Sequence, residues 1–276
     1  MALISAEELA ASLPHVRLLD ARPGTAAYAS GHLPGAVHAD LNVHLSAVSE
    51  PGFDPARGGR HPLPAPATWA AQLGAWGIAP ETKVVIYDAA KGGNAAARAW
   101  WMLRAFGHER VAVLDGGLES ALAAGLQLVT DDSPSPLARP PYPCDRWQRP
   151  TVGIEAVARL LHDPAWKVLD VRSRERWRGE VEPLDPVAGR IPGTLNLPFA
   201  EDLEPDGTFK SPATLRELYL NLLGGTPPTN LVVHCGSGVT ACHTLLALEI
   251  AKLDGASLYV GSYGEWCRST RPLGRG

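Results

Sequence analysis

Residues 231–243 read LVVHCGSGVTACH. The first four residues form a short apolar run typical of a buried strand, and a loop with two glycines separates them from a second apolar stretch. A strand, a glycine-rich loop and a helix together form the building unit of a parallel α/β sheet. We therefore expect a strand over 231–234 and a helix that begins near Val239 or Thr240.

The same plan occurs twice in the chain. KVVIYDAAKGGNAAARAWWMLRAFGHERVAVLDGG (83–117) parallels NLVVHCGSGVTACHTLLALEIAKLDGASLYVGS (230–262). Each stretch is expected to hold a buried strand, a glycine-rich turn, an amphipathic helix, a second strand and a glycine turn. Earlier in each half, VRLLDAR (16–22) and WKVLDVR (166–172) each precede an aromatic residue and a G-[HR]-[LI]-P-G sequence. This pattern indicates two copies of one unit.

The repeat predicts two domains, over 1–132 and 151–276. Between them, residues 133–150 read SPSPLARPPYPCDRWQRP, whose six prolines cannot sustain a helix or a central strand, so we expect an extended linker. In each half, short Val/Ile/Leu strands alternate with helical stretches. We therefore predict an α/β fold in which helices cover both faces of a mainly parallel sheet. Ligands of such sheets bind at the carboxyl ends of the strands.

Composition excludes several classes of function. The formal net charge is -4, and nucleic-acid binding proteins usually carry a basic patch or stripe. No run of about 18 apolar residues is present, so no membrane span is expected. The first residues, MALISAEELAASLP, lack a basic region followed by a long apolar core and are not expected to be a signal peptide. Instead, Ser5 is expected to cap a helix that carries Glu8 at the capping-box position.

The four cysteines form no C-x-x-C pair, which favours reduced thiols in the cytoplasm over a disulfide framework. A metal site is a second possibility, because His234, Cys235, Cys242 and His243 flank the loop. Adjacent strand residues point to opposite faces, so His234 and Cys235 cannot easily share an ion. We expect Cys242 on the core side of the helix, and no metal or cofactor.

Cys235 is expected to be the first residue of the strand-to-helix loop. The two glycines after it let successive backbone N–H groups turn inward, and the helix N-terminus adds the positive end of its dipole. A sulfur at the centre of this loop would be stabilised as a thiolate. Ser237 adds a hydroxyl that can donate to an anion or shuttle a proton. The loop therefore predicts a cysteine nucleophile in an anion cradle, with an inert buried cysteine as the alternative. The cradle is expected to comprise Gly236, Gly238, Val239 and Thr240.

The first copy of the repeat differs at this position. Asp88 occupies the place of Cys235 and is followed by AAKGGNAAR. A carboxylate lacks the sulfur chemistry of a thiol. We therefore expect the first copy to be catalytically empty and structural.

These motifs resemble the two-domain sulfurtransferases of the rhodanese superfamily, and the resemblance covers nearly the whole chain. It rests on the repeated G-[HR]-[LI]-P-G-[AT], on C-G-S-G-V-T-A at 235–241, and on GSYGEW at 261–266. The resemblance implies paired α/β domains with an active site between them in the second. It also implies a cysteine that takes sulfur from a small-molecule donor as a persulfide. The acceptor would be cyanide or a thiol, such as thioredoxin or a low-molecular-weight thiol.

The loop sequence bears on the sulfur donor. C-G-S-G-V-T is similar to the 3-mercaptopyruvate sulfurtransferase type, whereas the thiosulfate type commonly carries C-R-K-G-V-T. Thiosulfate is a dianion that suits two cationic side chains, and residues 236 and 237 offer none. A donor with one carboxylate and a carbonyl needs a hydroxyl near the sulfur, which Ser237 supplies, and an arginine further away. The resemblance thus favours 3-mercaptopyruvate, with thiosulfate as the alternative.

For that arginine, the family's R-[FY]-R-G motif matches Arg176, with Trp177 as the aromatic residue. Arg178 would point elsewhere, since we expect an extended segment here. Mercaptopyruvate enzymes carry a second arginine after an E-P-E-P stretch, where this chain has Leu184. Arg190 stands where G-H-I-P-G usually has histidine. It could supply the charge or be a surface arginine.

The first G-H-L-P-G sequence contains His32. In some family members this histidine has been proposed to work with the loop serine, so His32 could relay a proton from Ser237. The alternative, which we favour, is a histidine that hydrogen-bonds a turn. Each strand-end aspartate is expected to form an ion pair with a nearby arginine: Asp20 with Arg22, and Asp170 with Arg172.

Two rival classes compete with the sulfurtransferase. Some cell-cycle phosphatases share this fold, but they need a C-x5-R loop whose arginine clamps the phosphate. Here the sixth residue after Cys235 is Ala241, so that charge is missing. Rhodanese-like domains that lack the cysteine serve as scaffolds, and the presence of Cys235 argues against that role for the second half.

Overall fold

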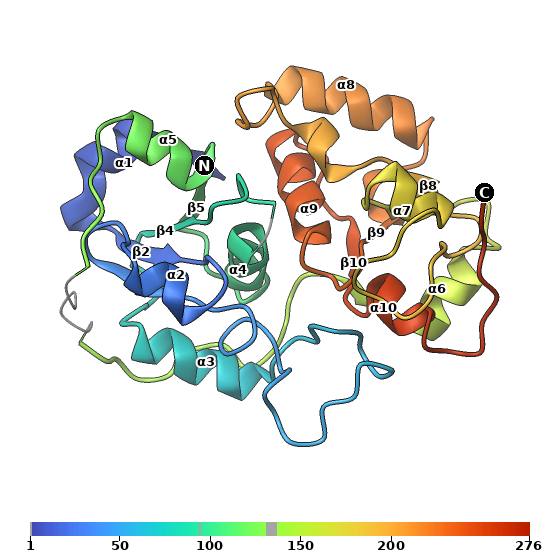
Figure 1. Ribbon diagram of the computed structural model, residues 1–276, viewed down its shortest axis with the longest axis horizontal. Coiled ribbons are helices and arrows are strands. Elements are labelled where there is room, and N and C mark those ends of the chain that lie inside the picture. The colour runs from blue at the N-terminus through green and yellow to red at the C-terminus, as the bar shows by residue number, and fades with distance from the viewer. Residues whose placement is uncertain (1, 94, 131–136) are drawn as a thin grey trace. The chain divides into compact units, whose positions relative to one another are not determined.

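The computed structural model describes residues 2–93, 95–130 and 137–276, and Figure 1 traces them. The chain forms two compact units. None of the described helices is long and apolar enough to cross a membrane. The N-terminal unit comprises residues 1–47, 63–148 and 205–208, and the C-terminal unit comprises 48–62, 149–204 and 209–276.

The N-terminal unit is built on a five-stranded sheet with the order β1-β5-β4-β2-β3, in which every pairing is parallel. The central strand β4 is buried along its whole length, as its sequence VVIY predicts. The strands are β1 (Leu3–Ile4), β2 (Arg17–Asp20), β3 (Ala36–His38), β4 (Val84–Tyr87) and β5 (Val111–Leu114).

The C-terminal unit repeats this sheet. Its order is β6-β10-β9-β7-β8, again with every pairing parallel, so each strand takes the place of the strand five numbers before it. The predicted α/β fold with two copies of one unit is confirmed. The strands are β6 (Thr151–Val152), β7 (Lys167–Asp170), β8 (Leu195–Asn196), β9 (Leu231–His234) and β10 (Ser257–Tyr259).

Helices flank both sheets. In the N-terminal unit they are α1 (Ala6–Ser12), α2 (Thr25–Ala29), α3 (Pro66–Ala75), α4 (Ala95–Ala105) and α5 (Gly117–Ala123), with a 3-10 turn η1 (Leu13–His15). In the C-terminal unit they are α6 (Ile154–Leu160), α7 (Arg174–Arg178), α8 (Pro212–Leu223), α9 (Ala241–Ile250) and α10 (Ser262–Trp266), with 3-10 turns η2 (Phe199–Asp202) and η3 (Pro228–Asn230).

Two expectations about the helices have different outcomes. The capping box at the start of α1 is confirmed, because Ser5 and Glu8 exchange both of its hydrogen bonds. The expectation that the helices after the two loops are amphipathic is wrong. Ten of the 11 residues of α4 and eight of the 10 residues of α9 are buried. Their alanines, leucines and tryptophans are therefore packed on nearly every side.

The aspartate at the end of β2 holds the turn that follows α2. Arg22 pairs with Asp20, with Nη2 2.5 Å from Oδ2, and the same Nη2 donates to the carbonyl of Gly31 at 2.6 Å. Both side chains are buried, and a buried charge is costly unless it is paired with an opposite charge, so the two side chains stabilise each other. The predicted ion pair is confirmed, and it ties the strand end to the first glycine of the G-x-x-P-G sequence.

The C-terminal unit contains the same arrangement. Arg172 pairs with Asp170 at 2.7 Å and donates to the carbonyl of Gly189 at 2.8 Å. Arg172 also reaches a second carboxylate, that of Glu182, at 3.1 Å. The second predicted ion pair is therefore confirmed, and it extends into an additional acidic residue.

The proline-rich stretch behaves differently from a free linker. Residues 137–148 form no helix or strand, but they pack on the N-terminal unit. The backbone N–H of Tyr142 donates to the carbonyl of Ala70, and a Cβ at Gly74 would lie 2.6 Å from the carbonyl oxygen of Pro140. Residues 137–148 therefore belong to the N-terminal compact unit, and the domain bounds expected from the repeat stay a prediction. Residues 133–136 of the expected linker lie outside the described residues.

One segment from the N-terminal half of the sequence belongs to the C-terminal unit, which was not predicted. Residues 48–62 lie between β3 and α3 in the sequence, yet they pack with the C-terminal unit. The backbone N–H of Gly58 donates to Glu265 Oε1 at 2.8 Å. At Gly59, whose φ is +79°, a Cβ would lie 2.3 Å from the carbonyl oxygen of Gly261, so only glycine allows this approach. Nothing in the hydrophobic pattern of the segment indicated this placement.

Candidate functional site

The loop between β9 and α9 begins at Cys235, directly after the strand. Cys235 is buried, with 3% of its surface exposed. Its backbone N–H donates to Ser262 Oγ at 3.2 Å, and its carbonyl accepts from the N–H of Tyr263 at 3.0 Å. The next carbonyl, of Gly236, accepts from the N–H of Gly264 at 2.9 Å. The first turn of α10 thus fixes the peptide planes of the first two loop residues.

The backbone of the loop turns toward the sulfur. The N–H of Ser237 donates to Cys235 Sγ with an N···S distance of 3.5 Å, and Ser237 is itself buried. Gly238 has φ +72°, and a Cβ there would lie 2.4 Å from the carbonyl oxygen of Val260. A side chain at this position is excluded both by backbone conformation and by lack of space. Thr240 is the N-cap of α9, which begins one residue later than expected, at Ala241.

Arg176 lies over this loop. A Cβ placed on Gly236 would come within 3.2 Å of Arg176 Nη2. The expected extended segment is wrong, because Arg174–Arg178 form the short helix α7, which ends at Gly179 in the left-handed conformation. Residues two apart on a helix still point to different sides, so Arg178 lies away from Arg176 and pairs with Glu180 at 3.6 Å.

A second guanidinium lies at the same place and was not predicted from the sequence. Arg60 Nη2 would be 2.8 Å from a Cβ on Gly236, which is closer than Arg176. Arg60 belongs to the segment 48–62 that packs with the C-terminal unit. The stretch GGRHPLP (58–64) is a polar, glycine- and proline-rich loop in sequence. Only a basic residue in such a loop could have drawn attention to it.

Buried Asp185 holds these arginines together. Its Oδ1 is 3.0 Å from Arg60 Nε and 2.8 Å from Arg268 Nη1, and its Oδ2 is 3.8 Å from Arg176 Nη2. The Asp185 side chain is fully buried. A buried carboxylate needs such partners, and in return it orders side chains that would otherwise move freely.

Glu182 provides a second buried carboxylate. It accepts from Arg176 Nη2 at 2.6 Å and lies 3.1 Å from Arg172 Nη1. Burial alone would raise the pKa of Glu182, but hydrogen bonds from Arg176 and from the N–H of Leu184, with the charges of both arginines, lower the pKa below its ordinary value. Glu182 therefore stays ionised and anchors Arg176 toward the loop.

The other two positions considered for substrate charge lie elsewhere. The side chain of Leu184 is exposed, at 57%. The guanidinium of Arg190 stacks over the Trp177 ring at 4.2 Å, and its Nη1 donates to the carbonyl of Gly276 at 2.6 Å. Arg190 thus joins the chain end to α7. The positive charge at the loop comes from Arg60 and Arg176.

His32 lies in the N-terminal unit, at the turn after α2. Its ring stacks on Tyr28 with the centroids 3.9 Å apart, and its Nδ1 lies 3.1 Å from the Tyr28 carbonyl, which can only accept. The proton is therefore on Nδ1. Nε2 is buried without a hydrogen-bond partner among the described residues. The turn contact that we favoured is present, and the proton relay stays a prediction.

The equivalent loop of the N-terminal unit is closed by its own aspartate. Asp88 Oδ1 accepts from the backbone N–H groups of Ala90 at 2.8 Å and Gly92 at 2.9 Å, and Oδ2 accepts from Ala96 at 3.0 Å. A buried carboxylate thus fills the cradle that the loop builds. This contact agrees with the structural role predicted for the first copy.

The residues considered as metal ligands are engaged separately. His234 Nδ1 lies 3.1 Å from the Cys235 carbonyl, and Cys242 Sγ donates to the Gly238 carbonyl at 3.3 Å. His243 stacks on Phe209, with the ring centroids 4.4 Å apart. Within the part of the chain that the structure describes, no group of three His, Cys, Asp or Glu residues is arranged to hold a metal ion.

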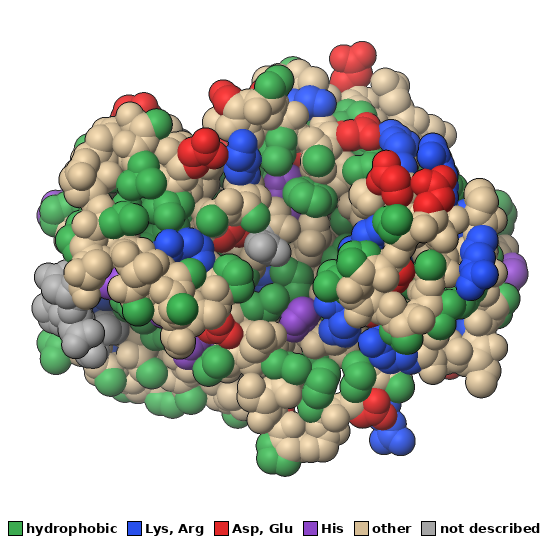
Figure 2. Space-filling view, viewed as in Figure 1, with side chains coloured by type: hydrophobic (Ala, Val, Ile, Leu, Met, Phe, Trp, Pro, Cys, Tyr) green, Lys and Arg blue, Asp and Glu red, His purple; other side chains and the backbone are tan. Residues whose placement is uncertain are grey.

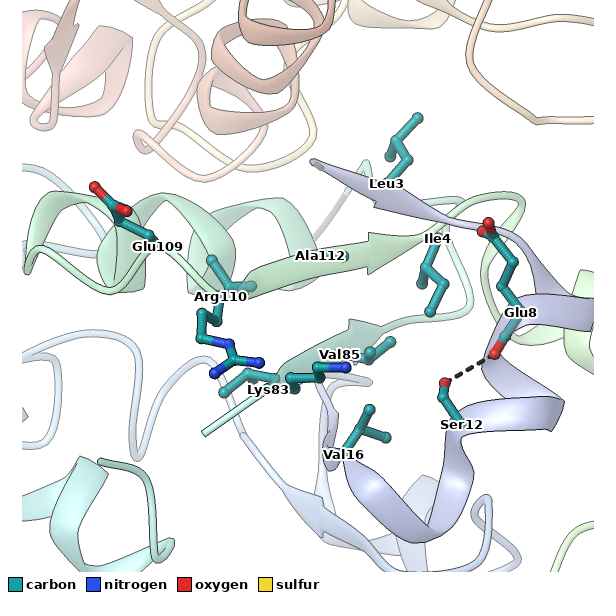
Figure 3. A pocket seen from close by; sticks show the side chains of 12 residues that line it. Leu3, Ile4, Glu8, Ser12, Val16, Lys83, Val85, Glu109, Arg110 and Ala112 are labelled. Atoms are coloured by element: carbon teal, nitrogen blue, oxygen red, sulfur yellow. Dashed lines mark hydrogen bonds between the residues drawn. The ribbon is translucent and has the colours of Figure 1, made fainter. Parts of the chain in front are cut away.

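The surface adds two observations. On the face shown in Figure 2, basic side chains lie among acidic ones rather than in one stripe. In the N-terminal unit, a largely apolar cavity of about 440 Å³ lies at the starting ends of β4 and β5 (Figure 3). Asp88 follows the opposite end of β4, so this cavity lies away from the Asp88 loop of the same unit. Its lining includes Leu3, Ile4, Val16, Lys83, Val85 and Arg110 and contains none of the predicted site residues.

Comparisons with known proteins extend over both units. A family model described as "Rhodanese-like domain" matches residues 5–124 and 154–269. A Pseudomonas aeruginosa protein, provisionally named a 3-mercaptopyruvate sulfurtransferase, is 42% identical over 283 residues, which cover 98% of this chain and 96% of that protein. A Mycobacterium tuberculosis protein, provisionally named a thiosulfate sulfurtransferase, is 39% identical over 287 residues, covering 99% and 97%. The solved structure of 3-mercaptopyruvate sulfurtransferase from Leishmania major matches with a TM-score of 0.83 and 29% identity, covering 98% of this chain and 75% of that chain.

Proposed function

Because this chain belongs to the family of rhodanese-like domains, we propose that it is a sulfurtransferase that takes sulfur from 3-mercaptopyruvate through a persulfide on Cys235. The Cys235 thiolate attacks the donor sulfur, and a sulfur–sulfur bond forms as the carbon–sulfur bond of the donor breaks. The bonding electrons pass to the methylene carbon, and the resulting pyruvate enolate takes up the proton of the donor thiol. Pyruvate leaves, and Cys235 carries the sulfur as a persulfide.

One observation carries this proposal: positive charge lies directly over the loop that begins at Cys235. Arg176 and Arg60 both lie close to the Cβ position of Gly236, and both are anchored by buried carboxylates. An anionic donor would therefore be drawn to the residue beside the sulfur nucleophile. Preorganised charge of this kind costs little reorganisation during the reaction.

Ser237 is proposed to act on the donor rather than on the sulfur already bound. Its N–H contacts Cys235 Sγ, and its hydroxyl follows on the same buried loop. A hydroxyl there can donate to the enolate oxygen as the carbon–sulfur bond breaks. The backbone of Gly236, Gly238, Val239 and Thr240 is proposed to stabilise the persulfide anion.

Thiosulfate is the second candidate donor, and the arrangement of charge near the loop is compatible with it. The loop has no charge of its own, yet two guanidiniums converge on it from other elements. Two cations suit a dianion as well as a carboxylate. The neutral Gly-Ser pair after Cys235 favours mercaptopyruvate between the two.

The proposed acceptor is a thiol, either of a thioredoxin-like protein or of low molecular weight, or cyanide. Attack on the outer persulfide sulfur returns Cys235 to the thiolate, so no other cofactor is needed for the cycle. We propose a cytoplasmic setting, because none of the four cysteines, all of which lie in the described part of the chain, forms a disulfide.

The proposal is tested by measuring pyruvate release from 3-mercaptopyruvate with dithiothreitol as acceptor. Wild-type protein should turn over and, without acceptor, gain the mass of one sulfur atom. Cys235→Ser should do neither, while Cys144→Ser should behave as wild type. The proposal is wrong if Cys235→Ser retains sulfur transfer. If thiosulfate gives a higher kcat/KM than mercaptopyruvate, the second candidate replaces the first.

A further inference from the structure

We propose that Arg60 is a substrate-binding residue that, with Arg176, binds the carboxylate of the sulfur donor. The inference rests on the proposed function and names the residue that supplies the charge missing from the loop. Arg60 Nη2 lies 2.8 Å from the Cβ position of Gly236, and Arg176 Nη2 lies 3.2 Å from it. Two guanidiniums therefore meet beside the residue that follows the nucleophile.

Arg60 is held at this place by its own segment. Just before it, Gly58 is bound by Glu265, and Gly59 lies so close to Gly261 that no side chain would fit. Arg60 Nε then donates to buried Asp185 at 3.0 Å. The segment and the carboxylate together fix the direction of the side chain, so the guanidinium is preorganised.

The hydrogen-bonding capacity of the two arginines suits an incoming carboxylate. Among the described residues, Arg60 uses its Nε for Asp185, and Arg176 uses Nε and Nη2 for Glu182. The terminal N–H groups of Arg60 and the Nη1 of Arg176 are left to a ligand. The Arg60 side chain is 20% exposed and that of Arg176 18%, so both are accessible yet partly shielded from water. Guanidinium groups bind carboxylates with two parallel hydrogen bonds.

The charge balance of the cluster also suits an anionic donor. Four guanidiniums are joined by ion pairs to three carboxylates, which leaves one positive charge in surplus. An anionic donor group would therefore be attracted to the cluster. The guanidiniums belong to Arg60, Arg172, Arg176 and Arg268, and the carboxylates to Asp170, Glu182 and Asp185.

Gly236 is part of the same arrangement. A side chain at this position would collide with the ends of both arginines. The thiosulfate-type loop, C-R-K-G-V-T, places an arginine at this position, whereas residue 236 of this chain is a glycine without charge. In this chain the charge comes from residue 60, and residue 236 stays small to admit it.

The test compares two donors that differ only in the carboxylate. Mercaptoacetone keeps the thiol and the carbonyl of mercaptopyruvate but lacks its carboxylate. For Arg60→Ala, we expect KM for mercaptopyruvate to rise about 10- to 100-fold, the effect of losing a charge-assisted hydrogen-bonded pair. The KM for mercaptoacetone should change less than about threefold, since that donor has no group for Arg60 to bind. Arg60→Lys, which keeps the charge but not the two-pronged geometry, should lie between.

Two controls distinguish carboxylate binding by Arg60 from a purely structural role. Arg57→Ala removes an exposed arginine of the same segment, whose only described ion pair is with Asp54, and should leave both donors unaffected. If Arg60 only supports the fold, Arg60→Ala will impair both donors equally. If the inference is wrong, mercaptopyruvate kinetics will not change. The failure of the proposed function is a different result, because then wild-type protein releases no pyruvate at all.

A binding measurement completes the test without turnover. In the Cys235→Ser background, calorimetric titration with mercaptopyruvate should give a Kd about 10- to 100-fold weaker when Arg60→Ala is added. The Kd for pyruvate, which keeps the carboxylate, should rise by a similar factor. An unchanged Kd for both ligands would overturn the assignment.

Discussion

The Asp88 loop and the Cys235 loop follow equivalent strands, β4 and β9, but they treat an anion in opposite ways. Asp88 accepts hydrogen bonds from two backbone N–H groups of its own loop and from one in the first turn of α4. Cys235 Sγ accepts one, from Ser237, and the charge over its loop comes from Arg60 and Arg176. The backbone of the first loop is filled by its own carboxylate, whereas the second loop is the one that we propose to receive an external anion. The carboxylate of Asp88 is part of the chain and stabilises its loop. The carboxylate of the proposed donor would bind and leave, which turnover requires.

The sharpest way to test this comparison is to give the second loop the residue of the first. Cys235→Asp should reduce pyruvate release at least about a thousandfold, because a carboxylate cannot form a persulfide. The variant should still fold, since its carboxylate meets the N–H of Ser237 and the nearby arginines. Pyruvate assays with urea unfolding would measure both effects. A variant that no longer folds would show that the two cradles are not equivalent.

Removing the internal anion should have the next largest effect. In Asp88→Ala, three backbone N–H groups lose their acceptor, two of them in buried hydrogen bonds, and we expect the free energy of unfolding to fall by about 2 to 4 kcal/mol. Chemical denaturation, monitored by tryptophan fluorescence, would measure this loss. Glu119→Ala, which removes an exposed carboxylate of the same unit, is the matched control. A loss below that of the control would mean that Asp88 does not hold its loop.

Alanine substitutions at two glycines of the Cys235 loop should affect different properties, stability at Gly238 and donor binding at Gly236. At Gly238 the positive φ and the Val260 carbonyl both oppose a side chain, so Gly238→Ala should cost about 2 kcal/mol or more in unfolding free energy. At Gly236 the obstacle is the terminal Nη2 of the Arg60 side chain rather than backbone, so Gly236→Ala should cost less than about 1 kcal/mol. It should instead raise the KM for mercaptopyruvate by displacing Arg60. Equal destabilisation by the two substitutions would contradict this distinction.

Much of this arrangement was predictable from the sequence, for physical reasons that differ between its parts. The strands around Cys235 and Asp88 are short apolar runs bounded by glycine, and the repeat fixed their equivalence. Arg176 was predictable because it lies in a local motif. Arg60 was not, because its position depends on a close backbone approach between residues distant in sequence, Gly59 and Gly261. Hydrophobic periodicity contains no record of such a contact.

The burial of α4 and α9 was not predictable for a related reason. Their sequences allow an amphipathic interpretation, because Arg98 interrupts the first and His243 the second. Both polar side chains are nevertheless fully buried. Single-sequence patterns identify which residues can be buried, but they do not identify polar residues that find buried partners.

The arginines of the two Asp-x-Arg motifs pair with different numbers of carboxylates, and this difference predicts a difference in how stability depends on pH. Within the described residues, the ion pairs of Arg22 involve only Asp20, whereas Arg172 pairs with both Asp170 and Glu182. The pKa of Glu182 is lowered in the folded protein, so its stabilising contribution is complete above about pH 4.5 and is lost as pH falls through the folded pKa.

Glu182→Gln should therefore weaken the acid dependence of stability. Between about pH 5 and pH 3 its unfolding free energy should fall less steeply than that of wild type, because the variant has no carboxylate to protonate there. Urea unfolding across this range would measure the two slopes. At neutral pH the variant should also bind mercaptopyruvate more weakly, since Arg176 loses its anchor. Identical slopes would show that Glu182 is not the titrating group.

The smallest expected effects on stability and turnover come from the two G-x-x-P-G turns. In each turn, the residue after the first glycine stacks on an aromatic ring. His32 stacks on Tyr28, and Arg190 stacks on Trp177. If both contacts are structural, Arg190→Ala should cost about 0.5 to 1 kcal/mol in stability and leave the kcat/KM for mercaptopyruvate within about twofold of wild type. His32→Gln should give the same pattern. A tenfold loss of kcat in His32→Gln, with stability unchanged, would break the equivalence, because a stacking residue affects folding whereas a proton relay affects turnover.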